Sequence, residues 1–126
     1  MATQAYSNID STTAIAAVLQ AATAGNPKDR PFVRDISGIL FTLKQRGFRF
    51  RDLGLRKIPG GFYSEDVENF VGQMLSMGYA TQRSPIRVGK EGERFCHSIV
   101  EAEKNREELA KLLGELENLL KVQWLP

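Results

Sequence analysis

The chain has 126 residues, of which 42% are hydrophobic and 25% charged, and its net charge of +2 is too small to indicate a partner by itself. This length suits one domain with a modest core, the composition excludes a disordered chain, and the single Cys96 excludes an internal disulfide framework. No apolar run approaches the roughly 20 residues of a membrane span, and no positive charge precedes the Ala-rich stretch 13–24 as a signal peptide requires, so we expect a cytoplasmic protein that does not enter a membrane.

The first half of the chain predicts a polar arm, two helices and a short strand. Residues 1–9 are expected to form a flexible arm, and Asp10 or Ser11 caps a helix that Gly25 and Pro27 end. The apolar residues of this helix are spaced i, i+3, i+4, i+7: Ile15, Val18, Leu19 and Ala22.

A second helix is expected from about Pro31 to Gly47, because proline suits a first helical turn and glycine a helix end. Its predicted buried stripe is Val33, Ile36, Ile39, Leu40 and Leu43. Phe48–Phe50 alternates apolar and basic residues, as a short strand does.

The segment from Arg51 to Phe62 is expected to be a loop. Leu53 and Leu55 allow one helical turn, but the Pro-Gly-Gly run at residues 59–61 stops anything longer. Ser64 then caps a third helix, with acidic residues in its first turn, and Gly78 ends it. The predicted inner stripe of this helix is Val67, Phe70, Val71, Met74 and Leu75. Two short strands, Tyr79–Gln82 and Ile86–Val88, follow, joined by a turn at residues 83–85.

A last helix is predicted from Glu91 to Val122. Such a helix would be on the order of 45 Å long, which exceeds what a domain of this size can cover. Its leucines therefore need a partner, and self-association into a homodimer is the simplest one. The expected dimer interface is Leu109, Leu112, Leu113, Leu116, Leu119 and Leu120.

The order of these elements, and the runs Ser64–Ala80 and Ile86–Phe95, carry a resemblance to a known superfamily. They resemble the helix, glycine, strand, wing, strand, Thr-x-x-Gly, helix run of MarR- and PadR-type winged helix-turn-helix regulators, with Gly89 at the threonine position. The resemblance covers about residues 33–100. It implies a mainly α fold with a small β wing: a winged-helix domain at residues 10–95 and a long C-terminal dimerisation helix at residues 96–126. It also implies DNA binding and transcription regulation.

A second, weaker similarity lies at Gly61-Phe62-Tyr63-Ser64. This run is similar to the Gly-Pro-Tyr-Ser of Panacea-type winged-helix proteins, with Phe62 in place of the proline. That group implies an antitoxin- or adaptor-like module that recognises proteins and does not bind DNA. This is the alternative function.

Basic residues on both sides of the third helix are the candidate contacts to double-stranded DNA. Residues 28–57 hold nine Lys/Arg against three Asp, a local charge of +6, and further bases mark the wing. The third helix itself exposes Glu65, Asp66 and Glu68, which phosphates would repel. The candidate DNA-binding set is Arg49, Arg51, Arg56, Lys57, Asn69, Gln73, Arg83, Arg87 and Lys90. The competing interpretation is that Arg56 and Lys57 pair with the three acids within the fold.

The sequence does not predict an enzyme. Cys96 and His97 are adjacent on a helix and therefore point about 100° apart, so they do not form a nucleophile–base pair. His97 and Glu101 are spaced i, i+4, but two ligands do not make a metal site. No phosphate-binding loop is present, and we expect no cofactor and no metal.

Overall fold

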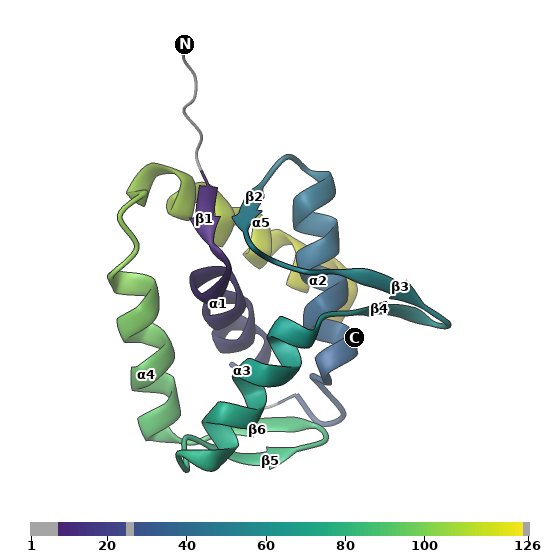
Figure 1. Ribbon diagram of the computed structural model, residues 1–126, viewed down its shortest axis with the longest axis vertical. Helices are drawn as coiled ribbons and strands as arrows, with labels where there is room; N and C mark the ends of the chain where they lie inside the picture. Colours follow the sequence, from purple (N-terminus) through teal and green to yellow (C-terminus); the bar gives the residue numbers. More distant parts are fainter. Residues whose placement is uncertain (1–7, 25–26, 125–126) are drawn as a thin grey trace.

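A computed structural model describes residues 8–24 and 27–124 of the chain, and this part is mainly helical (Figure 1). The five helices of the described residues are α1 (Ser11–Thr23), α2 (Val33–Gln45), α3 (Glu65–Ser76), α4 (Lys90–Glu101) and α5 (Arg106–Trp124). The strands are β1 (Asn8–Asp10), β2 (Arg49–Arg51), β3 (Arg56–Ile58), β4 (Gly61–Tyr63), β5 (Ala80–Arg83) and β6 (Ile86–Val88). None of the described helices combines the length and the apolar character that crossing a membrane requires.

Helix α1 is the centre of the core. Every residue from Thr13 to Leu19 is buried, and the helix packs against α2, α3, α4 and α5. Its alanines, Ala14, Ala16 and Ala17, let the neighbouring helices approach closely, since their side chains add little width. The Ala-rich composition that superficially suggests a signal peptide is thus the composition of a helix covered on all sides.

The predicted ends of α3 and the predicted C-terminal end of α2 are confirmed. Helix α2 begins at Val33, two residues after Pro31, and Gly25, the predicted end of the first helix, lies outside the described residues. The Ser64 hydroxyl accepts a hydrogen bond from the Val67 N–H at 3.4 Å, which caps α3. Gly47 and Gly78 follow the ends of α2 and α3, and each donates its N–H back to the last turn. The predicted stripes of the two helices are buried except for Val33 and Leu75, which are half-buried.

Strands β1 and β2 pair in parallel, with Ile9 opposite Phe50. Ile9 is fully buried, so the prediction that the flexible arm extends to residue 9 is wrong at its last two residues; residues 1–7 lie outside the described part. The predicted strand at residues 48–50 is present but shifted by one residue. Phe48 is buried, and its N–H donates to the Leu43 carbonyl at 3.2 Å, so this residue closes the end of α2 and the ladder starts after it.

The expected loop between β2 and α3 contains a β-hairpin instead of a helical turn. Strands β3 and β4 pair antiparallel around the two-residue turn Pro59-Gly60, in which Gly60 has a φ of +86°. Proline followed by a glycine at positive φ forms such a turn, so the residues that stop a helix here also reverse the chain. Phe62 of β4 stacks on Phe41 of α2, with ring centroids 3.9 Å apart, and holds the hairpin against the helical body.

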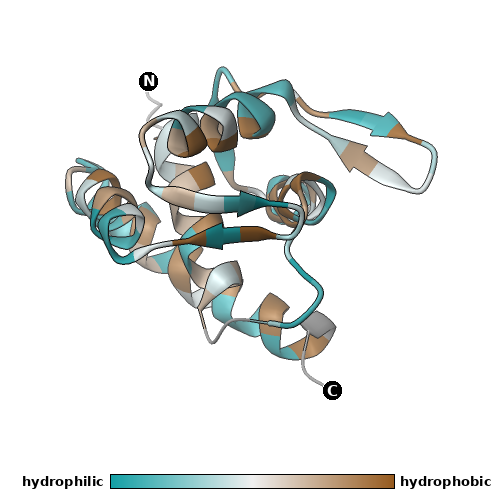
Figure 2. Cartoon of the chain, turned by 90° about the horizontal axis from the view of Figure 1, so that it is seen from below, coloured by the Kyte–Doolittle hydropathy of each residue, from teal (hydrophilic) through white to brown (hydrophobic). Residues whose placement is uncertain are grey.

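Strands β5 and β6 pair antiparallel and form the two-stranded hairpin predicted after α3, which is called the wing from here on. The Ile86 N–H donates to the Pro31 carbonyl at 2.7 Å, so the segment before α2 borders β6. Ile86 is fully buried, whereas Gln82 and Arg83 are exposed. Figure 2 shows this contrast between the hydrophobic β6 and the hydrophilic end of β5. The wing therefore contributes Ile86 of β6 and Ala80 of β5 to the core, while the rest of β5 faces solvent.

The prediction of a single long C-terminal helix is wrong, because residues 102–105 interrupt it and separate α4 from α5. Asn105 caps α5 by accepting a hydrogen bond from the Glu108 N–H at 3.3 Å. The Arg106 guanidinium donates to the Val100 and Glu101 carbonyls and so caps the end of α4. On each side of this interruption, backbone groups that lack a partner within their helix are thus hydrogen-bonded to a side chain.

Helix α5 packs back on α1, α2 and β1. Four of the six leucines assigned to a dimer interface, Leu109, Leu112, Leu116 and Leu119, are at most 4% exposed within this single chain. Leu120 is half-buried, and Leu113 is 40% exposed. The premise of the predicted dimer, an uncovered leucine stripe, is therefore wrong: the domain itself covers the stripe.

Candidate interaction surface on α3 and the wing

The solvent face of α3 is acidic and amidic. Glu65, Asn69, Gln73 and Ser76 are exposed along it, and no lysine or arginine belongs to the helix. Its middle borders a shallow hollow of about 480 Å³ that Asn69, Gln73 and Arg83 help to line. The wing thus supplies the basic side chain nearest to this face.

Arg83 of the wing forms an ion pair with Glu68 of α3. The side chain of Arg83 is half exposed, whereas that of Glu68 is 27% exposed. The sequence offered Arg56 and Lys57 as partners of the α3 acids, whereas the observed partner of Glu68 comes from β5, which follows the opposite end of the helix. A phosphate that approached Arg83 would therefore meet a guanidinium already neutralised by a carboxylate.

Arg87 anchors the loop between α1 and α2. Its guanidinium donates hydrogen bonds to the carbonyls of Pro27, Lys28 and Arg30, at 2.6, 3.0 and 2.9 Å. A fourth bond, of 3.0 Å, reaches the carbonyl of Ile86. With most of its donors engaged by the backbone, Arg87 ties the wing to the start of α2 and is a poor candidate for DNA contact.

We expect Arg87→Ala to lower the free energy of unfolding by about 1.5–3 kcal/mol, the range for hydrogen bonds to a charged group. Arg94→Ala is the matched control, since its ion pair with Glu91 joins two side chains that are 76% and 75% exposed and is worth about 1 kcal/mol or less. Urea unfolding followed by circular dichroism measures both. Equal, small effects for the two variants would contradict the anchoring role of Arg87.

The basic residues of the hairpin do not pair with the α3 acids in the described structure. Arg56 lies over the ring of Tyr63, 5.1 Å from its centroid, and Lys57 is exposed on β3. The Asp66 carboxylate instead accepts a 2.7 Å hydrogen bond from the Gly54 N–H. The acid at the second position of α3 thus fixes the loop that leads into the hairpin.

The two basic residues of β2 differ in their surroundings. Arg51 donates to the Asn8 carbonyl at 3.2 Å and lies 3.7 Å from an Asp10 oxygen. Arg49 is exposed on the same strand and is also engaged within the fold. Arg51 therefore fastens β1 to β2, which is a structural role.

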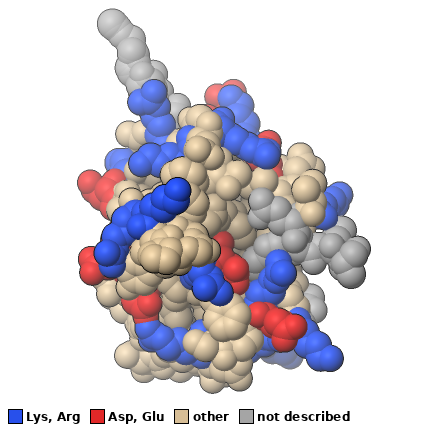
Figure 3. Space-filling model, turned by 90° about the vertical axis from the view of Figure 1, so that its right-hand side faces the viewer, with Lys and Arg blue, Asp and Glu red and all other residues tan. Residues whose placement is uncertain are grey.

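The two basic clusters lie at opposite ends of α3, since the hairpin precedes this helix and the wing follows it (Figure 1). A helix of 12 residues is about 18 Å long, and the acidic face of α3 fills the interval. Lys90 is exposed at the start of α4, beyond the wing. On the face from which the hairpin projects, Lys and Arg are interspersed with Asp and Glu (Figure 3). The candidate DNA contacts therefore form no continuous basic surface there.

The cysteine and histidine do not form a reactive site. Burial raises the pKa of the Cys96 thiol to about 11, so the thiol is protonated at neutral pH. His97 is exposed, and its Nε2 lies 3.9 Å from a Glu101 oxygen. Within residues 8–24 and 27–124, no three His, Cys, Asp or Glu side chains gather as a metal site would require.

Comparison with known proteins does not assign the chain to a family. No family model, no curated protein and no solved structure matches it.

Proposed function

We propose that this chain is a winged-helix domain that recognises a protein partner through the exposed face of α3 and does not read DNA sequence. The order α1, α2, α3, β5, β6 supports the winged-helix part, because it places a two-stranded wing directly after a third helix. The 19 residues from Arg46 to Ser64, with a hairpin among them, separate α2 from α3 and replace the short turn of DNA-reading helix-turn-helix motifs.

The composition of α3 carries this proposal. In DNA-reading winged helices this element enters the major groove, where arginine and lysine bind phosphates and base edges. Here Glu65 is exposed at its first turn, Asn69 and Gln73 follow on the same face, and the bordering Arg83 pairs with Glu68. The exposed carboxylate of Glu65 is repelled by a phosphate backbone, and no lysine or arginine of α3 offsets it. Together with the neutral amides it suits the polar and basic groups of a protein.

Binding to duplex DNA is the competing function, the one that the resemblance to MarR- and PadR-type regulators implies. It would rest on sequence-independent phosphate contacts from exposed bases such as Lys57 and Lys90. These two residues lie on the hairpin and at the start of α4, so α3 separates them. Whether the domain binds duplex DNA at low salt therefore decides between the two functions.

Fluorescence anisotropy with a labelled duplex of arbitrary sequence measures this directly. At about 50 mM salt, where phosphate contacts are strong, we expect no binding at micromolar protein. Salt-dependent binding that Lys57→Ala and Lys90→Ala both weaken would overturn the proposal. Both side chains are exposed, so these variants retain the fold.

A pair of α3 variants tests the protein-binding surface. Asn69→Arg and Gln73→Arg place a bulky cation on the exposed face without touching the core. Asn118→Arg on α5 is the control, since it makes the same change of one positive charge at an exposed position of another helix. We expect a co-purifying protein that the wild type and the Asn118→Arg variant retain and that both α3 variants lose. Equal retention by all four proteins would place the interface elsewhere.

A further inference from the structure

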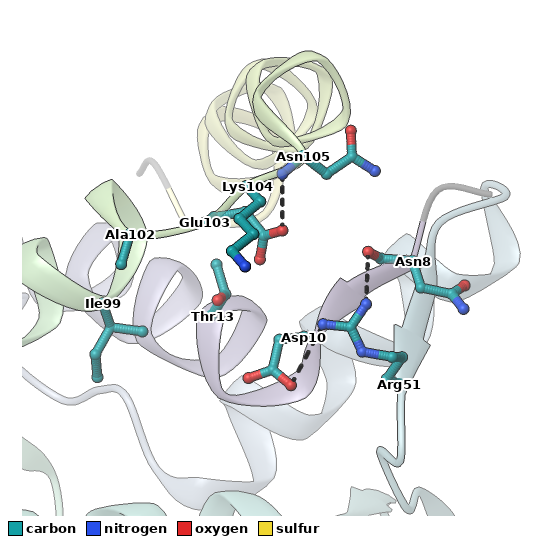
Figure 4. Close-up of a pocket in the computed structure, with 9 residues that line it drawn as sticks. All are labelled: Asn8, Asp10, Thr13, Arg51, Ile99, Ala102, Glu103, Lys104 and Asn105. Carbon is teal, nitrogen blue, oxygen red and sulfur yellow. Dashed lines mark hydrogen bonds and ion pairs between the residues drawn. The ribbon is translucent and has the colours of Figure 1, made fainter. Parts of the chain in front are cut away.

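A cavity of about 510 Å³ opens where four elements end (Figure 4). Its lining comes from β1, β2, the first turn of α1, Ile99 in the last turn of α4 and the connection between α4 and α5. The volume falls within the range of about 300–1,000 Å³ typical of small-molecule sites. None of the residues proposed above for the α3 surface lines it.

Glu103, in the connection between α4 and α5, is a buried carboxylate on this cavity. The residue is only 8% exposed, and one carboxylate oxygen accepts a 3.1 Å hydrogen bond from the Asn105 N–H. No described lysine, arginine or histidine lies within ion-pair distance of it. One backbone donor and the nearby start of α5 compensate the charge only in part, because a carboxylate accepts up to four hydrogen bonds.

The neighbouring Lys104 also lines the cavity and has no ion pair among the described residues. The other two charged residues of the lining, Asp10 and Arg51, are paired with each other at 3.7 Å. The cavity is therefore neutral overall, and it presents one unpaired carboxylate and one unpaired ammonium group.

We propose that this cavity binds a small zwitterion of the amino-acid class. The ligand's ammonium group donates to the Glu103 carboxylate, and its carboxylate pairs with Lys104. The neutral lining disfavours multiply charged ligands such as nucleotides, since neither sign of charge is in excess. Ile99 and Ala102 supply the apolar part of the wall, against which an aliphatic side chain packs.

Thermal unfolding of the full chain in the presence of the twenty free amino acids and dialanine tests this proposal, because a ligand that binds only the folded state raises Tm with concentration. We expect at least one of these zwitterions to do so at about 10 mM or below, the range of weak small-ligand affinities. Its N-acetyl and its amide derivatives each lack one of the two charges and should bind at least about tenfold more weakly, since each loses a charge-assisted contact.

Variants identify the site. Glu103→Gln keeps an oxygen that accepts the Asn105 hydrogen bond, so the connection should fold while affinity falls about tenfold or more with the lost charge. Lys104→Met should have a similar effect, and Glu117→Gln, exposed on α5, should leave affinity unchanged. A panel without any Tm shift would overturn the proposal, as would equal affinity of the wild type and the Glu103→Gln variant. Neither result bears on the α3 surface, because the two regions share no residue.

Discussion

Leu112→Ala is expected to destabilise the domain by about 2–5 kcal/mol, as large-to-small changes in a closed core do. Leu112 is completely buried on α5, which packs against α1 and α2. Removing three side-chain carbons there leaves a cavity between three helices, and the surrounding structure closes it only in part. Urea unfolding monitored by far-UV circular dichroism measures the loss, as a lower midpoint at unchanged slope.

Leu113→Ala is the matched control, because Leu113 is the same residue type one position further on and is 40% exposed. We expect it to change the free energy of unfolding by less than about 1 kcal/mol. If α5 were instead a dimerisation helix, unfolding midpoints would rise with protein concentration, and Leu112→Ala would weaken this dependence. A dimer at micromolar concentration in sedimentation that Leu112→Ala dissociates into folded monomers would contradict the packing of α5 on its own domain.

The elements that follow from local chemistry were predictable from the sequence. The start of α3 is predictable because Ser64 is a capping residue and acids follow it in the first turn. Gly47 and Gly78 end their helices because glycine adopts the backbone conformation that a helix end needs. The break between α4 and α5 carries a local signal as well. Asn105 and Glu108 have the spacing of a capping box, and the continuous leucine pattern obscured it.

Long-range partners were not predictable in the same way. A strand as short as β1 carries no periodic signal. It pairs with β2, some 40 residues later, and packs against α5, so the burial of Ile9 depends on distant parts of the chain. The ion pair of Arg83 with Glu68 depends likewise on the wing folding back along α3. The sequence therefore shows where the basic residues stand in the chain, and only the structure shows which of them form contacts within the fold.

Gly92→Ala is expected to destabilise the domain by about 3 kcal/mol or more, at the upper end of the cost of overpacking. A Cβ atom at Gly92 would lie 2.2 Å from the Tyr79 carbonyl oxygen and 2.5 Å from a methyl carbon of Val88. The first of these is backbone and cannot rotate away, so α4 would have to move off the wing. Thermal or urea unfolding detects the loss, and amide exchange at Tyr79 and Val88 should report the local opening.

Gly114→Ala separates this steric effect from the general effect of alanine in a helix. Nothing lies within 4 Å of a Cβ built at Gly114 on α5, so the change should stabilise the domain by about 0.5–1 kcal/mol through helix propensity alone. We therefore expect Gly92→Ala to lower and Gly114→Ala to raise the free energy of unfolding. Stabilisation by both would mean that α4 does not contact the start of the wing as closely as the structure has it. The contact gives a physical reason for a glycine at residue 92: α4 crosses Tyr79, the residue before β5, at backbone distance, where no side chain fits.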